Sequence, residues 1–249
     1  MKRFMGHKRT WWIIGTAFLL ICWIGVSLLI DNEVILPSPW QVGRAFAALL
    51  KKTDTYVVLG TTLLRLLLAL VISFVLALIS AALSILKKEI AYFIRPIIVT
   101  LKTLPVAALI ILLLVMVGHE KSPIVICGFV VFPLFYEVMY QGMKKIDRSL
   151  LDEIKTISSL NWQIIYHIHI PLAIPYLITG LLQGIGLGLK VMVMAELLAQ
   201  PRQSIGKMLL LEKQYLHIDV VFAWAILLII VVGLVEIMIN RWQKKVLLW

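Results

Sequence analysis

Six stretches of this chain are apolar for about 20 residues or more, and they recur from one end of the sequence to the other. The hydrocarbon core of a bilayer is about 30 Å thick, so a spanning helix needs roughly 20 apolar residues. We therefore predict an all-α integral membrane protein with about six transmembrane helices. The predicted spans are residues 11–30, 57–86, 90–118, 124–143, 172–199 and 220–239.

The overall composition excludes an ordinary soluble domain. Hydrophobic residues make up 61% of the 249 residues and charged residues only 15%, against about 45–50% and about 25% in soluble domains. Lipid can cover this much apolar surface, whereas water cannot. Because the apolar runs recur throughout, residues 1–249 are expected to form a single transmembrane domain.

The placement of the basic residues predicts the orientation. With the N-terminus in the cytoplasm, the inner segments hold fourteen Lys and Arg residues and the outer segments seven, and three more lie within spans. Such an excess marks the cytoplasmic side, so both termini are expected inside. This explains the net charge of +11 without invoking nucleic acid.

Two regions depart from a simple succession of spans. Lys102 and Pro105 interrupt the third apolar run, where we predict a kink. The loop over residues 31–56 has proline turns and then an amphipathic stretch, residues 42–50, which we expect to lie on the outer membrane surface.

The longest inner loop, residues 144–171, carries two short amphipathic patterns. Ser149 and Asp152 have the spacing of a capping box, and Asn161 can cap a second short helix that contains Trp162. Pro171 ends the segment and can open the next span. The apolar faces of these helices can pack on the protein's own spans or on lipid headgroups, or they can dock on a cytoplasmic partner. The amphipathic pattern alone does not distinguish these alternatives.

This loop resembles the coupling segment of binding-protein-dependent ABC importer permeases. Their pattern is Glu-Ala-Ala, three residues, Gly, nine residues, then Ile-x-Leu-Pro. Here Asp152-Glu153-Ile154 is followed at the same spacings by Ser158 and by Ile168-His169-Ile170-Pro171. Other stretches resemble the nitrate/sulfonate/taurine branch of that family, in order along the chain: residues 36–39, 61–65, 102–105, 157–163, 171–175 and 195–197.

The resemblance implies a type I ABC importer permease of the bacterial cytoplasmic (inner) membrane. Two permease copies, expected to be a homodimer, would form one pathway. An extracytoplasmic substrate-binding protein would deliver the substrate, a small anion or small organic solute. ATP and Mg would be held by a cytoplasmic ABC ATPase dimer that grips the coupling segment, through Asp152, Glu153, Ile154, Ile157, Ser158, Leu160, Asn161 and Trp162.

Charged residues at membrane depth usually mark a pathway or a buried ion pair. Lys190 is our main candidate for the pathway, because the resemblance places the fifth span near the dimer axis; the alternative is an ion pair with Glu137. Lys102, Glu137 and Glu196 are further candidates, and for Lys102 a structural role is favoured. Lys190 and Glu196 are six residues apart, about 240° around a helix, so they cannot pair with each other.

Three glycines recur every four residues on the fifth span, at Gly180, Gly184 and Gly188. Small residues at this spacing permit close helix packing. The contact can lie within one chain or between two copies, and the spacing does not separate these alternatives.

No catalytic motif is present. The sequence contains no Gly-rich loop followed by Lys and Ser/Thr, so the chain is expected to bind no nucleotide or other cofactor and to leave ATP hydrolysis to a partner. The competing function is a self-contained secondary transporter or channel driven by an ion gradient. Intramembrane carboxylates fit it equally well, but it does not need the two short cytoplasmic helices.

Overall fold

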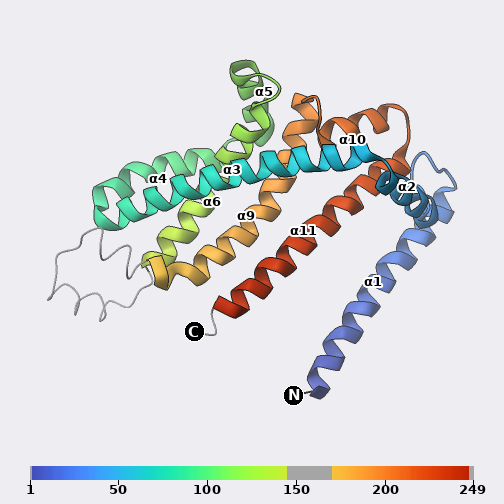
Figure 1. The fold of residues 1–249 in the computed structure, drawn as a ribbon, viewed down its shortest axis with the longest axis horizontal. Helices are drawn as coiled ribbons and strands as arrows, with labels where there is room; N and C mark the ends of the chain where they lie inside the picture. Colours follow the sequence, from blue (N-terminus) through green and yellow to red (C-terminus); the bar gives the residue numbers. More distant parts are fainter. Residues whose placement is uncertain (1, 145–169, 247–249) are drawn as a thin grey trace. The chain divides into compact units, whose positions relative to one another are not determined.

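The computed structural model describes residues 2–144 and 170–246, and these are helical apart from short connections. Within them lie nine helices (Figure 1). They are α1 (Lys2–Ile30), α2 (Pro39–Lys51), α3 (Thr53–Leu86), α4 (Lys88–Thr103), α5 (Val106–Val117), α6 (Ser122–Lys144), α9 (Ile170–Ala199), α10 (Ile205–Gln214) and α11 (Ile218–Val246).

Four of these helices are long and apolar enough to cross a membrane: α3, α6, α9 and α11. They coincide with four of the six predicted spans. The first predicted span lies in α1, whose apolar part, Ile14–Ile30, is shorter than the other four. By length and composition, the described residues thus hold four spans, or five if the bent pair α4–α5 counts as one.

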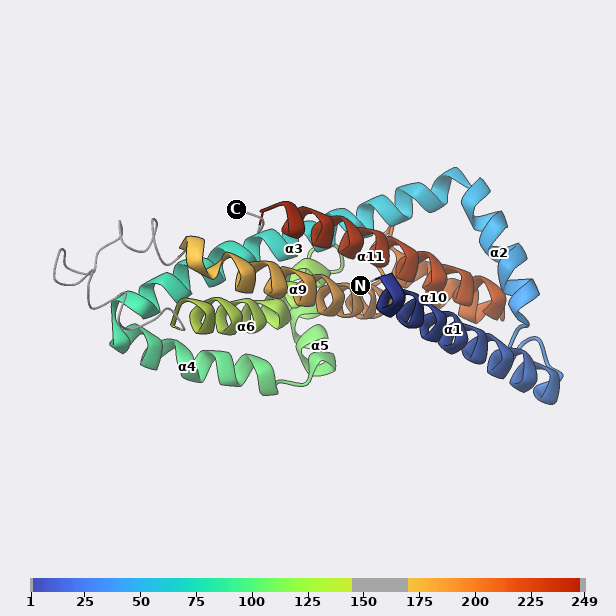
Figure 2. The same cartoon turned by 90° about the horizontal axis from the view of Figure 1, so that it is seen from below.

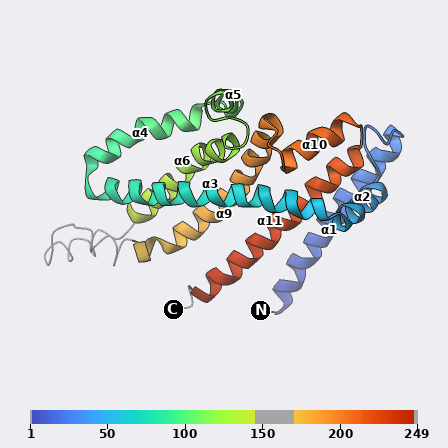
Figure 3. The same ribbon diagram turned by 45° about the horizontal axis from the view of Figure 1, so that its top comes forward.

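The third predicted span is a broken pair of helices rather than one kinked helix. The axes of α4 and α5 differ by 101°; in Figure 3 α4 is seen from the side and α5 nearly end-on. Leu104 and Pro105 both have extended backbone, with ψ of 128° and 123°. A proline disfavours helical geometry in the residue before it and donates no backbone hydrogen bond, so the break falls where the sequence indicates a kink.

The predicted amphipathic stretch is a helix, α2, with a well-formed start. The Ser38 hydroxyl accepts from the Gln41 backbone, and the Gln41 side chain accepts from the Ser38 backbone at 2.7 Å. Its buried face is Val42, Ala45 and Leu49. The loop before it is tied to α1, because the Trp23 indole donates to the Pro37 carbonyl at 3.1 Å. Its position on the outer membrane surface stays a prediction.

The chain divides into two compact units. One comprises Met1–Val57 and Met208–Ile230, and the other Val58–Lys207 and Val231–Trp249. Every described residue that the sequence marks as functional belongs to the second unit. The single permease domain over residues 1–249 remains a prediction.

The core of the second unit forms where α6 and α9 run side by side (Figures 1 and 2). Ile126, Val131 and Phe135 of α6 have no exposed surface, and neither does Met192 of α9. Phe74 of α3 meets the Phe135 ring edge-on, with centroids 5.5 Å apart. This core fixes the orientation of α9, which carries five of the seven candidate site residues that the structure describes.

Candidate functional site

One face of α9 packs against the same chain through its glycines. A Cβ atom added to Gly184 would overlap the Phe135 ring of α6, and one added to Gly180 would lie 3.1 Å from Val138. At Gly188 an added Cβ would lie 3.1 Å from Leu66 of α3. Of the two alternatives left open by the spacing, the structure shows packing within one chain.

Another face of α9 is exposed and carries two polar side chains among apolar ones. Gln183 and Lys190 line an open hollow of about 490 Å³, together with Glu236 and Asn240 of α11. Within the described residues Lys190 makes no ion pair, although Glu236 lines the same hollow. Lys190 is therefore an exposed cation without a counter-ion among the residues that the structure describes.

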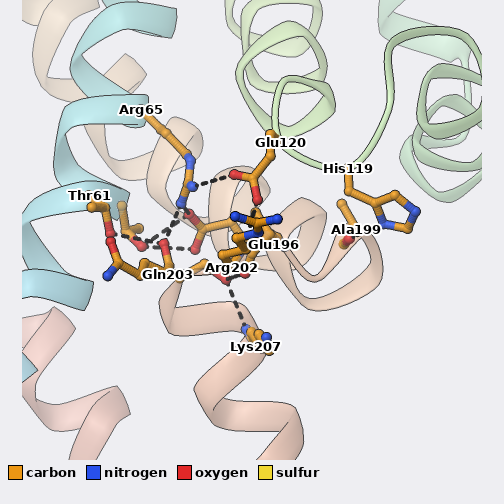
Figure 4. A network of polar contacts seen from close by, with 12 residues as sticks. Thr61, Arg65, His119, Glu120, Glu196, Ala199, Arg202, Gln203 and Lys207 are labelled. Atoms are coloured by element: carbon orange, nitrogen blue, oxygen red, sulfur yellow. Dashed lines mark hydrogen bonds and ion pairs between the residues drawn. The ribbon is translucent and has the colours of Figure 1, made fainter. Parts of the chain in front are cut away.

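Glu196, unlike the exposed Lys190, is fully buried, since its side chain has no exposed surface. Its carboxylate accepts from the Thr62 hydroxyl at 2.9 Å, from Arg65 Nη1 at 3.1 Å and from the Gly206 backbone at 3.3 Å (Figure 4). The Thr62 hydroxyl in turn accepts from the Ile205 backbone at 3.1 Å. Both Glu196 oxygens are thus satisfied, as a buried charge requires.

Arg65 extends this cluster to two loops. Its Nη1 donates to the Gln203 carbonyl at 2.6 Å, and its Nη2 donates to Glu120 at 3.1 Å. The other Glu120 oxygen accepts from the Arg202 backbone at 2.9 Å. The cluster, which we call the clasp, comprises Thr62, Arg65, Glu120, Glu196 and the backbone of residues 202–206.

The clasp joins segments that are distant in sequence. It connects α3, the loop between α5 and α6, the end of α9 and the loop before α10 (Figure 4). The Lys and Arg count assigns these ends to the outside, so one network holds the predicted outer ends of three helices. With every oxygen of Glu196 occupied and no surface exposed, its role in a pathway stays a prediction.

The other intramembrane pair is between Lys102 and Glu137. Lys102 Nζ lies 2.8 and 2.9 Å from the two Glu137 oxygens, and the side chains are 51% and 37% exposed. Glu137 therefore pairs with Lys102 rather than with Lys190, which corrects the alternative given for Lys190. A pathway role for Lys102 and Glu137 is a prediction that this geometry leaves standing.

The coupling residues lie outside the described residues. Asp152, Glu153, Ile154, Ile157, Ser158, Leu160, Asn161 and Trp162 all fall between the end of α6 and the start of α9. Their role in docking an ATPase remains a prediction.

The sequence analysis gave no role to Glu120, which is part of the clasp, or to the neighbouring His119. His119 Nδ1 lies 2.6 Å from the Ala199 carbonyl, beside the clasp (Figure 4). The one signal in the sequence is the spacing of Thr62 and Arg65, three apart on one helix face. It indicates a shared partner but does not name one.

A metal centre has no support in the part of the chain that the structure describes. No three His, Cys, Asp or Glu side chains there lie close enough together to hold an ion.

Comparison with known proteins supports the interpretation of the apolar helices as parts of a membrane transport protein. Residues 73–247 match the family described as "Binding-protein-dependent transport system inner membrane component". The chain is 26% identical over 244 residues to the "Taurine transport system permease protein TauC" of Escherichia coli (strain K12), covering 95% of this chain and 88% of that protein. It is 24% identical over 250 residues to the "Putative aliphatic sulfonates transport permease protein SsuC" of Bacillus subtilis (strain 168), covering 98% and 90%.

Solved structures show the same fold. The inward-facing MetNI methionine ABC transporter matches with a TM-score of 0.65 at 17% identity, over 75% of this chain and 93% of that chain. A bacterial ABC transporter involved in the import of the acidic polysaccharide alginate matches with a TM-score of 0.69 at 16% identity, over 98% and 99%. The family match covers well over half of the sequence, and the chain belongs to the inner-membrane permeases of binding-protein-dependent ABC importers.

Proposed function

We propose that two copies of this chain form the membrane pathway of an ATP-driven importer for a small sulfonate or a related small anion. The observation that carries the substrate class is similarity over nearly the whole chain to a taurine and an aliphatic-sulfonate permease. An extracytoplasmic binding protein delivers the substrate, and a cytoplasmic ABC ATPase dimer supplies the energy. The chain itself is not an enzyme.

The exposed face of α9 supports an anionic substrate. Lys190 has no counter-ion among the described residues, and Gln183 and Asn240 add amide donors to the same hollow. A sulfonate offers three acceptor oxygens, and charge-assisted hydrogen bonds to such groups are about twice as strong as neutral ones. A second copy facing this hollow would enclose the site.

Reconstitution tests the energy source. The full chain would be placed in proteoliposomes with its co-purifying ATPase and binding protein, and uptake of radiolabelled taurine measured. We expect uptake only with ATP, ATPase and binding protein together. Uptake by the chain alone, driven by an ion gradient, would establish the competing secondary transporter instead.

A second experiment tests the coupling segment. Leu160→Asp and Trp162→Asp each place a charge on the predicted docking face, and should abolish uptake while leaving the chain in the membrane. Trp162→Phe keeps an apolar ring there and serves as the control, with uptake near that of the parent protein. Normal uptake in both Asp variants would count against ATPase docking at this segment.

A further inference from the structure

A cavity of about 780 Å³ lies between α4 and α6 in the second unit. The two helices are neighbours in Figures 1 and 2, and their closest polar contact is the Lys102–Glu137 pair. From that pair, the lining residues run toward the start of α4 and the end of α6. None of the clasp residues contributes to it.

The cavity has a surplus of cations. Lys88, Arg95 and Lys144 line it, and all three are exposed. The only lining carboxylate, Glu137, is already held at both oxygens by Lys102. In the described part of the chain, no carboxylate forms an ion pair with any of the three. The lining therefore attracts an anion.

Tyrosines add to the cationic lining. Tyr92 is 70% exposed at the edge of the cavity, and the Tyr140 ring has Lys144 Nζ 5.8 Å from its centroid. Tyr136 is less available, since its hydroxyl pairs with Ser84 at 3.0 Å. Hydroxyl donors beside fixed cations suit an oxyanion that accepts several hydrogen bonds.

A second, apolar cavity of about 340 Å³ is lined by other residues of the same two helices, α4 and α6, and by α3. Its lining comes from Ile97 and Leu101 of α4, from α3 residues that include Ile72 and Leu76, and from five residues of α6: Ile124, Val125, Gly128, Phe129 and Phe132. The only hydroxyl in its lining, that of Ser73, donates to the Gly128 carbonyl at 3.1 Å. A free oxyanion gains nothing from such a neighbour, whereas an acyl chain does.

We propose that the cationic cavity between α4 and α6 binds the phosphate headgroup of an anionic phospholipid whose acyl chain extends along the neighbouring apolar cavity. The excess of inner Lys and Arg residues assigns Lys88, Arg95 and Lys144 to the cytoplasmic side. That leaflet carries anionic lipid, and basic pockets between transmembrane helices on that side suit such headgroups. The exposed side chains of Phe93 and Ile97 give α4 an apolar outer surface near the cationic cavity.

Native mass spectrometry of the purified full chain in detergent tests this site. The chain would be titrated with phosphatidylglycerol and, separately, with phosphatidylcholine of the same acyl chains. We expect the parent protein to retain phosphatidylglycerol at least about tenfold more tightly. Equal retention of the two lipids would overturn the proposal without any variant being needed.

Matched variants locate the binding. Lys88→Gln combined with Arg95→Gln removes two cavity cations, while Lys87→Gln combined with Arg241→Gln removes two exposed cations that do not line it. At about fivefold for each charge, the cavity variant should lose roughly thirtyfold in phosphatidylglycerol binding, and the control variant far less. An equal loss of phosphatidylglycerol binding in both variants would mean that the lipid is attracted only by overall charge, and would contradict the proposed site.

The source of the phosphate is tested by competition. Millimolar inorganic phosphate should leave phosphatidylglycerol bound to the parent protein, because the acyl chain contributes to retention. Displacement of the lipid by phosphate at such concentrations would identify a free anion as the occupant and contradict the lipid proposal. Arg95→Gln alone, which changes one exposed side chain, repeats the test if the double variant fails to fold.

Discussion

The two faces of α9 differ in packing, in burial and in the polar partners of their charged residues. One face carries Gly180, Gly184 and Gly188 against neighbouring side chains and ends in Glu196, which has no exposed surface. The other carries Gln183 and Lys190 on an open hollow. Both faces contain a charge within the span, so charge at membrane depth does not by itself indicate function. The two charges differ in their partners: the Glu196 carboxylate accepts four hydrogen bonds from three residues, whereas Lys190 has no ion pair among the described residues.

The largest effect on stability is expected from Glu196→Ala. It leaves Arg65 with one carboxylate fewer and leaves the Thr62 hydroxyl proton and the Gly206 amide without their acceptor in a buried site. Breaking a buried pair from one side costs about 3–5 kcal/mol. The free energy of unfolding, measured by denaturant titration in mixed micelles, should fall by that amount.

Two further variants separate charge from hydrogen bonding at the same position. Glu196→Gln keeps an acceptor for Thr62 or Gly206 and should be less harmful than Glu196→Ala. Removing both charges together, with Arg65→Leu and Glu196→Leu, should recover part of the loss, because no unpaired charge then remains buried. A Glu196→Ala protein as stable as the parent would show that the clasp does not hold the fold.

The glycine face gives the next largest effect. In Gly184→Ala the new methyl group meets the Phe135 ring, and overpacking of this kind costs about 1–3 kcal/mol. Gly186→Ala is the control, since a Cβ there has nothing within 4 Å, and alanine favours a helix by up to about 1 kcal/mol over glycine. The two variants should shift the thermal unfolding midpoint in opposite directions, and a shared direction would contradict the assignment of the faces.

The sequence predicted α9 and its glycine periodicity well, because both depend on local spacing. It also predicted that Lys190 and Glu196 face different ways. It could not predict the distant partners of Glu196, because Thr62 and Arg65 are 134 and 131 residues away and meet it only when the start of α3 and the end of α9 come together. The angle at Pro105 was out of reach for a similar reason: proline marks where a helix breaks, but packing sets the 101° turn.

The half-exposed Lys102–Glu137 pair should contribute much less to stability than the clasp. At 51% and 37% exposure, such a pair typically contributes about 0–1 kcal/mol. Lys102→Gln should therefore lower the free energy of unfolding by less than about 1 kcal/mol, and raised salt should reduce the difference further. A loss as large as that of Glu196→Ala would mean that this pair is buried in the assembled transporter.

The smallest effect on stability is expected from Lys190→Gln. The side chain is exposed and has no described ion pair to lose, so the unfolding midpoint should not change. Uptake of an anionic substrate in proteoliposomes should nevertheless fall at least about tenfold, the loss of one hydrogen bond to a charged group. Lys190→Arg should retain most uptake. If the Lys190→Gln protein were unstable, Lys190 would have a structural role in the fold, as Glu196 has.

The clasp gives α9 one anchored end. The helix is 30 residues long, or about 45 Å at 1.5 Å per residue, and the anchor lies in its last turn. A long rod anchored at one tip behaves as a lever. Because α6 packs along the glycine face of α9, a force applied near Ile170 would swing the two helices together about Glu196 rather than slide α9 along its axis. Lys190, less than two turns from the anchor, would then move through a short arc, whereas residues near the start of α9 would move through a wide one.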